Sequence, residues 1–176
     1  MASIIKTAKQ NMLTKASGIT GVKHHAVWNN QLDLILTGEG VSFDMPAIFP
    51  ELIFNPSILL GTGISQSSVL WRLHILHQQL DAGDGTLDQN LDIDDLRDLV
   101  KVTFTRYQPK NCTPLAYVGD EPDYSHNNVY HHIIDFTCTF IDTKGSPLDP
   151  DSTEWNEVDA SGYTLTIIDD PSKPFL

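Results

Sequence analysis

Histidine is the residue type in this chain with the widest chemical potential, because imidazole binds transition metals and titrates near neutral pH. The 176 residues include His24, His25, His74, His77, His126, His131 and His132. Residues next to each other, or three apart, point to opposite faces of a strand, so no close pair among them can share a metal on one strand. A site formed across strands, for example by His74 and His131, stays open. We predict that the chain needs no metal and no other cofactor.

Aspartates cluster between residues 81 and 98, where a calcium-binding loop is the obvious hypothesis. An EF-hand loop that began at Asp81 would have Gly83 and Gly85 at its third and fifth positions, where oxygen ligands are required. A loop that began at Asp88 would have Ile93 at the sixth position, which requires glycine. Neither register therefore fits an EF-hand loop. The cluster is therefore predicted to be a solvated loop followed by the acidic first turn of a helix.

The sequence contains no complete motif for nucleophilic catalysis. The run Gly-Ile-Ser-Gln-Ser at residues 63–67 lacks the closing glycine of a nucleophile elbow. The glycines at 61 and 63 lack the third glycine of a dinucleotide fingerprint. Cys138 alternates onto the inner side of an expected strand, which favours a core position. The sequence therefore predicts a protein that is not an enzyme, and a metal-dependent enzyme built on the histidines is the less favoured alternative.

The charge of the chain is strongly negative. Eleven Lys and Arg residues oppose 23 Asp and Glu residues, which gives a formal net charge of −12. Proteins that bind nucleic acid use clustered Lys and Arg on the phosphates, so this composition disfavours such binding. The sequence has no run of the roughly 18 apolar residues that a bilayer span needs. We expect a protein made in a cytoplasm and without a membrane partner.

The pattern of apolar residues predicts an α+β fold with a small mixed, mainly antiparallel sheet and two helices on one face. Helices are expected at 3–17 and 91–104, strands at 24–29, 45–55, 67–80, 112–120 and 129–142, and loops at 31–45 and 55–68. Pro46 and Pro50 remove ladder donors, which predicts that strand 45–55 lies at an edge or is bulged. Alternation on the strands predicts that Trp71, Leu73, Ile134 and Phe136 are buried against helix 91–104.

The composition changes after Asp142, which divides the chain into a body at 1–142 and an acidic C-terminal arm at 143–176. The arm carries apolar residues that favour docking on its own body, on a neighbouring copy or on another protein. The predicted interface residues are Trp155, Tyr163, Leu165, Ile167 and Phe175 in the arm, and Ile58 and Leu59 in loop 55–68.

The order of these elements resembles the tail-terminator (tail-completion) and neck-ring proteins of tailed bacteriophages. The matching segments are IIKTAKQNMLTKASGITGVKHHAVWNN, MPAIFPELIF, SSVLWRLHILHQ, NLDIDDLRDLV and DYSHNNVYHHIIDFTCTFID. The resemblance extends over about residues 3–142. The strand, the NLDIDDLRD helix and the DYSHNNVYHHIIDF segment occur in the order found in versions from phages of Bacteroides-type hosts.

The resemblance implies a virion structural protein, made in the bacterial host cytoplasm, that forms a six-fold or twelve-fold homomeric ring. Such a ring would lie in the neck or at the head-proximal end of the tail, against portal or adaptor rings and tail proteins. DNA would pass through it without specific binding, and a negative wall suits that passage because it repels the polyanion. The alternative is a monomeric or dimeric protein-binding module.

Overall fold

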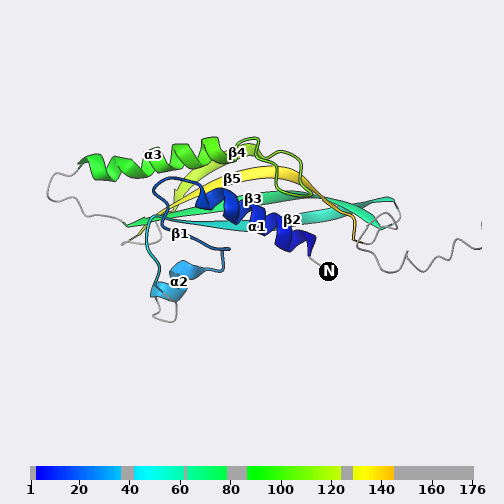
Figure 1. Cartoon of the computed structure of the whole chain (residues 1–176), viewed down its shortest axis with the longest axis horizontal. Helices are drawn as coiled ribbons and strands as arrows, with labels where there is room; N and C mark the ends of the chain where they lie inside the picture. Colours follow the sequence, from blue (N-terminus) through cyan, green and yellow to red (C-terminus); the bar gives the residue numbers. More distant parts are fainter. Residues whose placement is uncertain (1–2, 37–41, 62, 79–86, 124–128, 145–176) are drawn as a thin grey trace, which may run out of the picture.

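The computed structural model describes residues 3–36, 42–61, 63–78, 87–123 and 129–144 (Figure 1). The arm residues expected at an interface, Trp155, Tyr163, Leu165, Ile167 and Phe175, lie outside the described residues.

A five-stranded sheet in the order β1-β2-β3-β5-β4 forms the centre of the molecule (Figure 1). Its strands are β1 (His24–His25), β2 (Ala47–Gly61), β3 (Ile64–Gln78), β4 (Ala116–Asp123) and β5 (Val129–Asp142). β1 pairs in parallel with the start of β2, and every other neighbouring pair is antiparallel. The predicted α+β fold with a mixed, mostly antiparallel sheet is confirmed.

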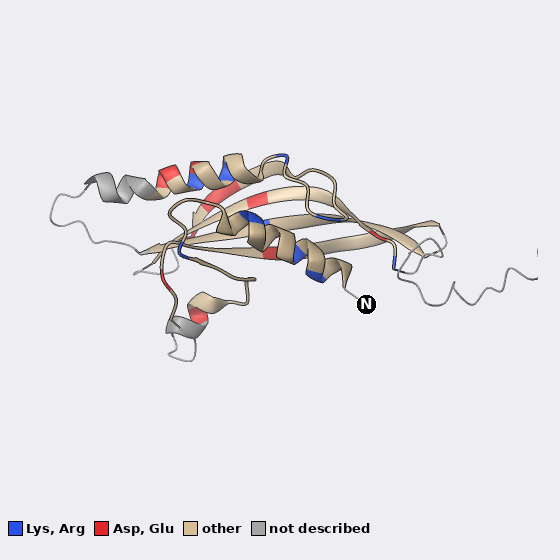
Figure 2. Cartoon of the chain, in the orientation of Figure 1, with Lys and Arg blue, Asp and Glu red and all other residues tan. Residues whose placement is uncertain are grey.

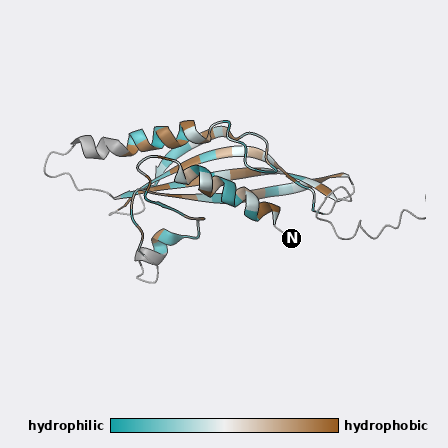
Figure 3. Ribbon diagram, viewed as in Figure 1, coloured by the Kyte–Doolittle hydropathy of each residue, from teal (hydrophilic) through white to brown (hydrophobic). Residues whose placement is uncertain are grey.

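Two helices cover one face of the sheet, which we call the inner face. Helix α1 (Ile4–Ser17) buries Ala8, Met12 and Ala16, which recur every four residues, and the Ser3 side chain accepts a hydrogen bond from the Lys6 N–H at 3.3 Å. Helix α3 (Leu87–Phe104) begins four residues earlier than expected. Figure 3 colours the strands and helices by hydropathy.

The core between the helices and the inner face has the predicted composition. Trp71, Leu73, Ile134 and Phe136 have no exposed surface, and they pack in one cluster with α3 residues such as Phe104. Both cysteines, Cys112 and Cys138, belong to the same cluster as buried free thiols. The faces assigned to β3 and β5 from alternation are therefore confirmed.

The predicted loop at 55–68 is wrong. β2 continues to Gly61, β3 begins at Ile64, and the two strands form one long hairpin. The prolines and glycines suggested a break, but the ladder accommodates Pro56 at an irregularity between Phe54 and Ser57. Gly63 has a φ of 71°, a left-handed conformation that glycine adopts readily at the turn.

The predicted loop at 31–45 is also wrong in part, because it contains helix α2 (Gln31–Leu36). Asn30 precedes the helix with a φ of 56°, and its side-chain amide donates to Asp33 Oδ2 at 2.5 Å. Leu32 packs with Ala47, Phe49 and Leu76 in a second cluster. A single short helix shows too little periodicity to be found from sequence.

The bounds of β1 and β4 also differ from the predictions. The segment 24–29 contains only the two-residue β1, and β4 spans 116–123 instead of 112–120. The predicted edge character of 45–55 holds beyond Ile48, the last residue of β2 that pairs with β1. The Pro50 carbonyl accepts from the Trp28 N–H at 3.1 Å, so the backbone of Pro50 faces away from β3 and its missing N–H removes no ladder bond.

Candidate functional site

A hydrogen-bonded line of four side chains crosses the outer face of the sheet, opposite α1 and α3. His74 Nδ1 on β3 lies 2.9 Å from His131 Nε2 on β5. His74 Nε2 lies 3.2 Å from Glu51 Oε2 on β2, and His131 Nδ1 lies 2.9 Å from Asp123 Oδ2 on β4. We call these four residues the histidine network. The structure thus brings together the cross-strand pair that the sequence left open.

The protons of the histidine network follow from its geometry. With both carboxylates ionised, each terminal bond requires an N–H on the imidazole, because a carboxylate only accepts. The central bond requires one N–H and one bare nitrogen. Three protons on four ring nitrogens leave the two histidines with one shared positive charge. Either carboxylate balances that charge, so all three bonds are satisfied at once.

Burial decides which histidine is neutral. His74 is 5% exposed, and the Trp28 indole stacks on it at a centroid distance of 3.8 Å and an interplanar angle of 6°. Burial, followed by the charges of His131 and Arg72, lowers the pKa of His74 from 6.5 to about 3. His74 is therefore the neutral member of the pair, with its one N–H on Nε2, where it donates to Glu51.

The histidine network supports a structural role in this fold. Its four residues bond to one another, Trp28 stacks on His74, and Trp28 and His131 lie at a ring-centroid distance of 5.7 Å. Among the described residues, no group of three or more His, Cys, Asp or Glu side chains is arranged to hold a metal ion. Sequence reasoning missed Glu51, Asp123 and Trp28, because only the register of four strands places them beside the histidines.

The neutrality of His74 predicts a pH-dependent contribution to stability. In the unfolded chain its imidazole takes up a proton as the pH falls below 6.5, whereas the folded site does not until about pH 3. The contribution is complete above pH 6.5 and is lost as the pH falls, by about 2 kcal/mol at about pH 5. Urea unfolding of the wild type and of His74→Gln at about pH 7.5 and about pH 5 measures this difference. Parallel losses in the two proteins would contradict it.

A second polar cluster lies on the inner face around Asp120 of β4. Its carboxylate accepts from Arg97 of α3, from the Tyr117 hydroxyl at 2.5 Å, and from His132 Nε2 at 3.3 Å. Burial raises the pKa of Asp120, but the hydrogen bonds from Tyr117 and Arg97 outweigh burial and leave the pKa below its ordinary value. Burial lowers the pKa of His132. The cluster ties α3 to the edge of the sheet.

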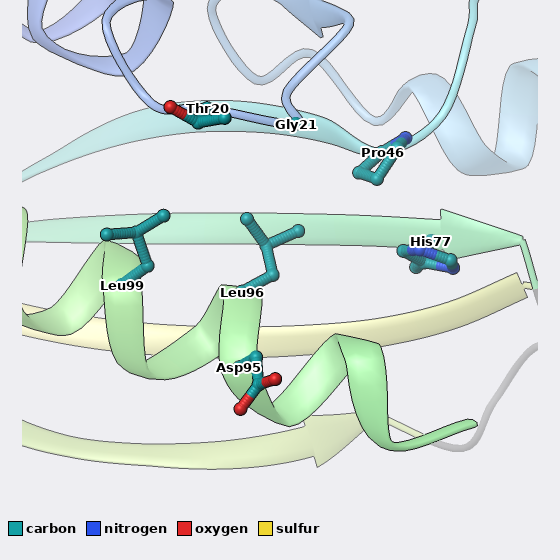
Figure 4. A pocket seen from close by; sticks show the side chains of 7 residues that line it. All are labelled: Thr20, Gly21, Pro46, His77, Asp95, Leu96 and Leu99. Atoms are coloured by element: carbon teal, nitrogen blue, oxygen red, sulfur yellow. The ribbon is translucent and has the colours of Figure 1, made fainter. Parts of the chain in front are cut away.

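A cleft of about 310 Å³ lies between α3, the end of β3 and the segment that follows α1. It is lined by Thr20, Gly21, Pro46, His77, Asp95, Leu96 and Leu99 (Figure 4). In Figure 4, Leu96 and Leu99 extend from one side of α3, and Asp95 lies on the lower side of the helix. Two leucines, a proline and a glycine make the lining largely apolar, which is typical of a packing gap between elements.

The β2–β3 hairpin carries the two predicted interface residues that the structure describes. Ile58 is 58% exposed and Leu59 is 75% exposed, and both belong to strand β2 instead of a loop. Phe54 and Leu60 beside them are 44% and 54% exposed. Figure 1 shows the hairpin running past the N-terminal end of α1, where no helix covers it. Four large apolar side chains thus meet solvent on one strand.

Neither the scan against protein-family models nor the search of curated proteins finds a match for this chain. Within the described residues, no helix is both long enough and apolar enough to cross a membrane.

Proposed function

We propose that this chain is a non-catalytic structural subunit that assembles with copies of itself into a ring of six or twelve. The resemblance in element order to tail-terminator and neck-ring proteins of tailed bacteriophages places that ring, in this proposal, in the neck or at the head-proximal end of the tail of a virion. Portal or adaptor rings and tail proteins are its neighbours there, and DNA passes through its lumen.

The observation that carries the proposal is the exposed apolar side chains on an open strand edge. From Glu51 onward, β2 has no strand partner on its outer side among the described residues. Ile58 and Leu59 are exposed beside this edge, which Pro56 and two register shifts interrupt. Neighbouring exposed apolar side chains are typical of a surface that another protein covers. The nearest charge on β2 is Glu51, and the segment 52–61 has none. The hairpin is therefore suited to burial against another protein surface.

The negative net charge of the chain supports the proposed passage of DNA through the lumen of the ring. A net charge of −12 repels the phosphates of DNA, so a passing duplex would not adhere to the wall.

The mass of the protein in solution tests this function. We expect sedimentation velocity and native mass spectrometry to find a species of six or twelve chains of 19.6 kDa each. Leu59→Lys places a charge in the apolar contact and should weaken assembly at least about tenfold. Asn29→Lys is the matched control, because Asn29 is exposed between β1 and α2, outside the hairpin, and the change in net charge is the same.

Two results would contradict the proposal. A wild-type protein that stays monomeric or stops at a dimer across the accessible concentration range would favour the alternative of a protein-binding module. Assembly of Leu59→Lys with wild-type affinity would show that the hairpin is not in the contact.

A further inference from the structure

We propose that the contact between neighbouring copies joins two different surfaces of the chain: the β2 surface of one copy packs on the β4 surface of the next. The β2 surface consists of Phe54, Ile58, Leu59 and Leu60 with the adjacent helix α1. The β4 surface consists of Tyr117 and Val118 with the adjacent helix α3, including Val102. This inference rests on the proposed function and names the partner of the hairpin.

We choose these two surfaces because the exposed large hydrophobic side chains lie on them. The large hydrophobic residues that are exposed among the described residues are Ile5, Phe54, Ile58, Leu59, Leu60, Leu99, Val102, Tyr117 and Val118. The first five lie on α1 and β2, and the last four lie on α3 and β4. The outer faces of the central strands β3 and β5 contribute none. Exposed apolar surface is therefore divided between the two sides of the sheet, where contacts with other copies are possible.

The charges on the two surfaces are opposite. Helix α1 carries Lys6, Lys9 and Lys15 and no acid, and the first 32 residues contain no Asp or Glu at all. β4 carries Asp120, Glu121 and Asp123 and no base, and of these Asp120 bonds to Arg97 and Asp123 to His131. On α3, Asp94 and Asp95 are exposed, Arg97 is paired with Asp98 and Asp120, and Lys101 Nζ lies 3.8 Å from the centroid of the Tyr117 ring. Glu121, Asp94 and Asp95 are therefore the acids that leave the β4 surface negative. Figure 2 shows blue residues on α1, both red and blue residues on α3, and red residues on β4.

Complementary charge matters more here because the chain as a whole is acidic. With a net charge of −12, two copies repel each other unless the contact brings a basic surface to an acidic one. Contact of two β4 surfaces would bring together Glu121 and Asp94 from both copies. Contact of two β2 surfaces would bring together the lysines of α1. Only the mixed contact pairs opposite charges while it covers both apolar patches.

The sheet order makes this contact suitable for a ring. β2 and β4 lie on opposite sides of the central strands β3 and β5. A contact between two different surfaces is heterologous, so each copy uses one surface for the copy before it and the other for the copy after it. Such a contact closes into a ring when the rotation between copies closes, whereas a contact of one surface with itself stops at a dimer.

Charge reversal on each surface tests the pairing. The first variant carries Lys6→Glu and Lys9→Glu on α1. The second carries Asp94→Lys on α3 and Glu121→Lys on β4, two exposed residues. Each variant alone presents like charges at the contact, and we expect each to assemble at least about tenfold more weakly than the wild type at low ionic strength. An equimolar mixture should recover assembly, because copies that alternate restore opposite charges at every contact.

The control carries Lys23→Glu and Asn29→Glu, two exposed positions outside both surfaces. Its net charge is within one unit of that of the first variant, so it should assemble as the wild type does if general repulsion is not the cause. Circular dichroism of every variant checks the fold.

The outcomes separate this inference from the proposed function. If the wild type forms rings, and the two variants also form rings separately, the ring stands and the pairing of the β2 and β4 surfaces is wrong. If the mixture recovers association but the wild type forms open chains or pairs, the pairing stands and the closed ring is wrong. A wild type that stays monomeric, with no association in the mixture, overturns both.

Discussion

Replacing Phe136 by alanine is expected to lower the free energy of unfolding by about 3–5 kcal/mol. The ring lies on β5 with no exposed surface, and its centroid is 6.3 Å from that of Phe104 on α3 and 6.1 Å from that of Tyr117 on β4. Alanine would leave a cavity at the point where the sheet meets α3. Urea unfolding at neutral pH measures the loss.

Phe54→Ala is the matched control, because the same atoms are removed from a ring that is 44% exposed. Phe54 makes an edge contact with the buried ring of Phe140, at a centroid distance of 5.6 Å. We expect a loss of less than about 1.5 kcal/mol for this variant. A loss below about 1 kcal/mol for Phe136→Ala would mean that the faces of β5 are assigned wrongly.

Alternation was sufficient to predict the faces of the long strands. Trp71 and Leu73 on β3 alternate with Arg72 and His74, and the structure buries the first pair under the helices and places the second pair on the outer face. A strand has one side-chain period, so a single correct position fixes every other position on the same strand. The same logic separated His131 from the neighbouring His132.

Breaks in the pattern were harder to predict from sequence. Asn55-Pro56 and the glycines at 61 and 63 are typical of a loop, yet β2 continues through Asn55-Pro56 to Gly61 and only Gly63 lies in the turn before β3. β2 tolerates Pro56 because the register shifts there, and only the neighbouring strand reveals such a shift. Local composition therefore placed the interface candidates Ile58 and Leu59 correctly as exposed residues, but in the wrong element.

The polar clusters depend on register between strands, which no local pattern encodes. Glu51 reaches His74 because β2 and β3 pair Glu51 with Arg72, and His74 is the next residue of β3 on the same face as Arg72. Asp123 reaches His131 because β4 and β5 pair these two residues directly. The sequence contains seven histidines and many acids, and it does not show which of them are neighbours. The pairing of four strands brings Glu51, His74, His131 and Asp123 together.

Replacing Asp120 by alanine is expected to lower the free energy of unfolding by about 3 kcal/mol. The Asp120 side chain is 12% exposed and accepts hydrogen bonds from Arg97, Tyr117 and His132. Alanine would leave the guanidinium of Arg97 without its less exposed partner and would remove the hydrogen bond that joins that side chain to β4. Asp120→Asn keeps an acceptor oxygen, so we expect it to lose less than the alanine variant does.

Asp98→Ala provides the matched control, because Asp98 pairs with the same Arg97 but is 67% exposed. An exposed ion pair contributes little, so the expected loss is below about 0.5 kcal/mol. The pKa of Asp120 lies below its ordinary value of 3.8, so its stabilisation is present above that pH and is lost as the pH falls below it. The difference between the wild type and Asp120→Ala in urea unfolding should therefore shrink when the pH is lowered from neutral to about 3. Equal losses for Asp98→Ala and Asp120→Ala, or a difference that does not change with pH, would show that burial does not strengthen the bond between α3 and β4.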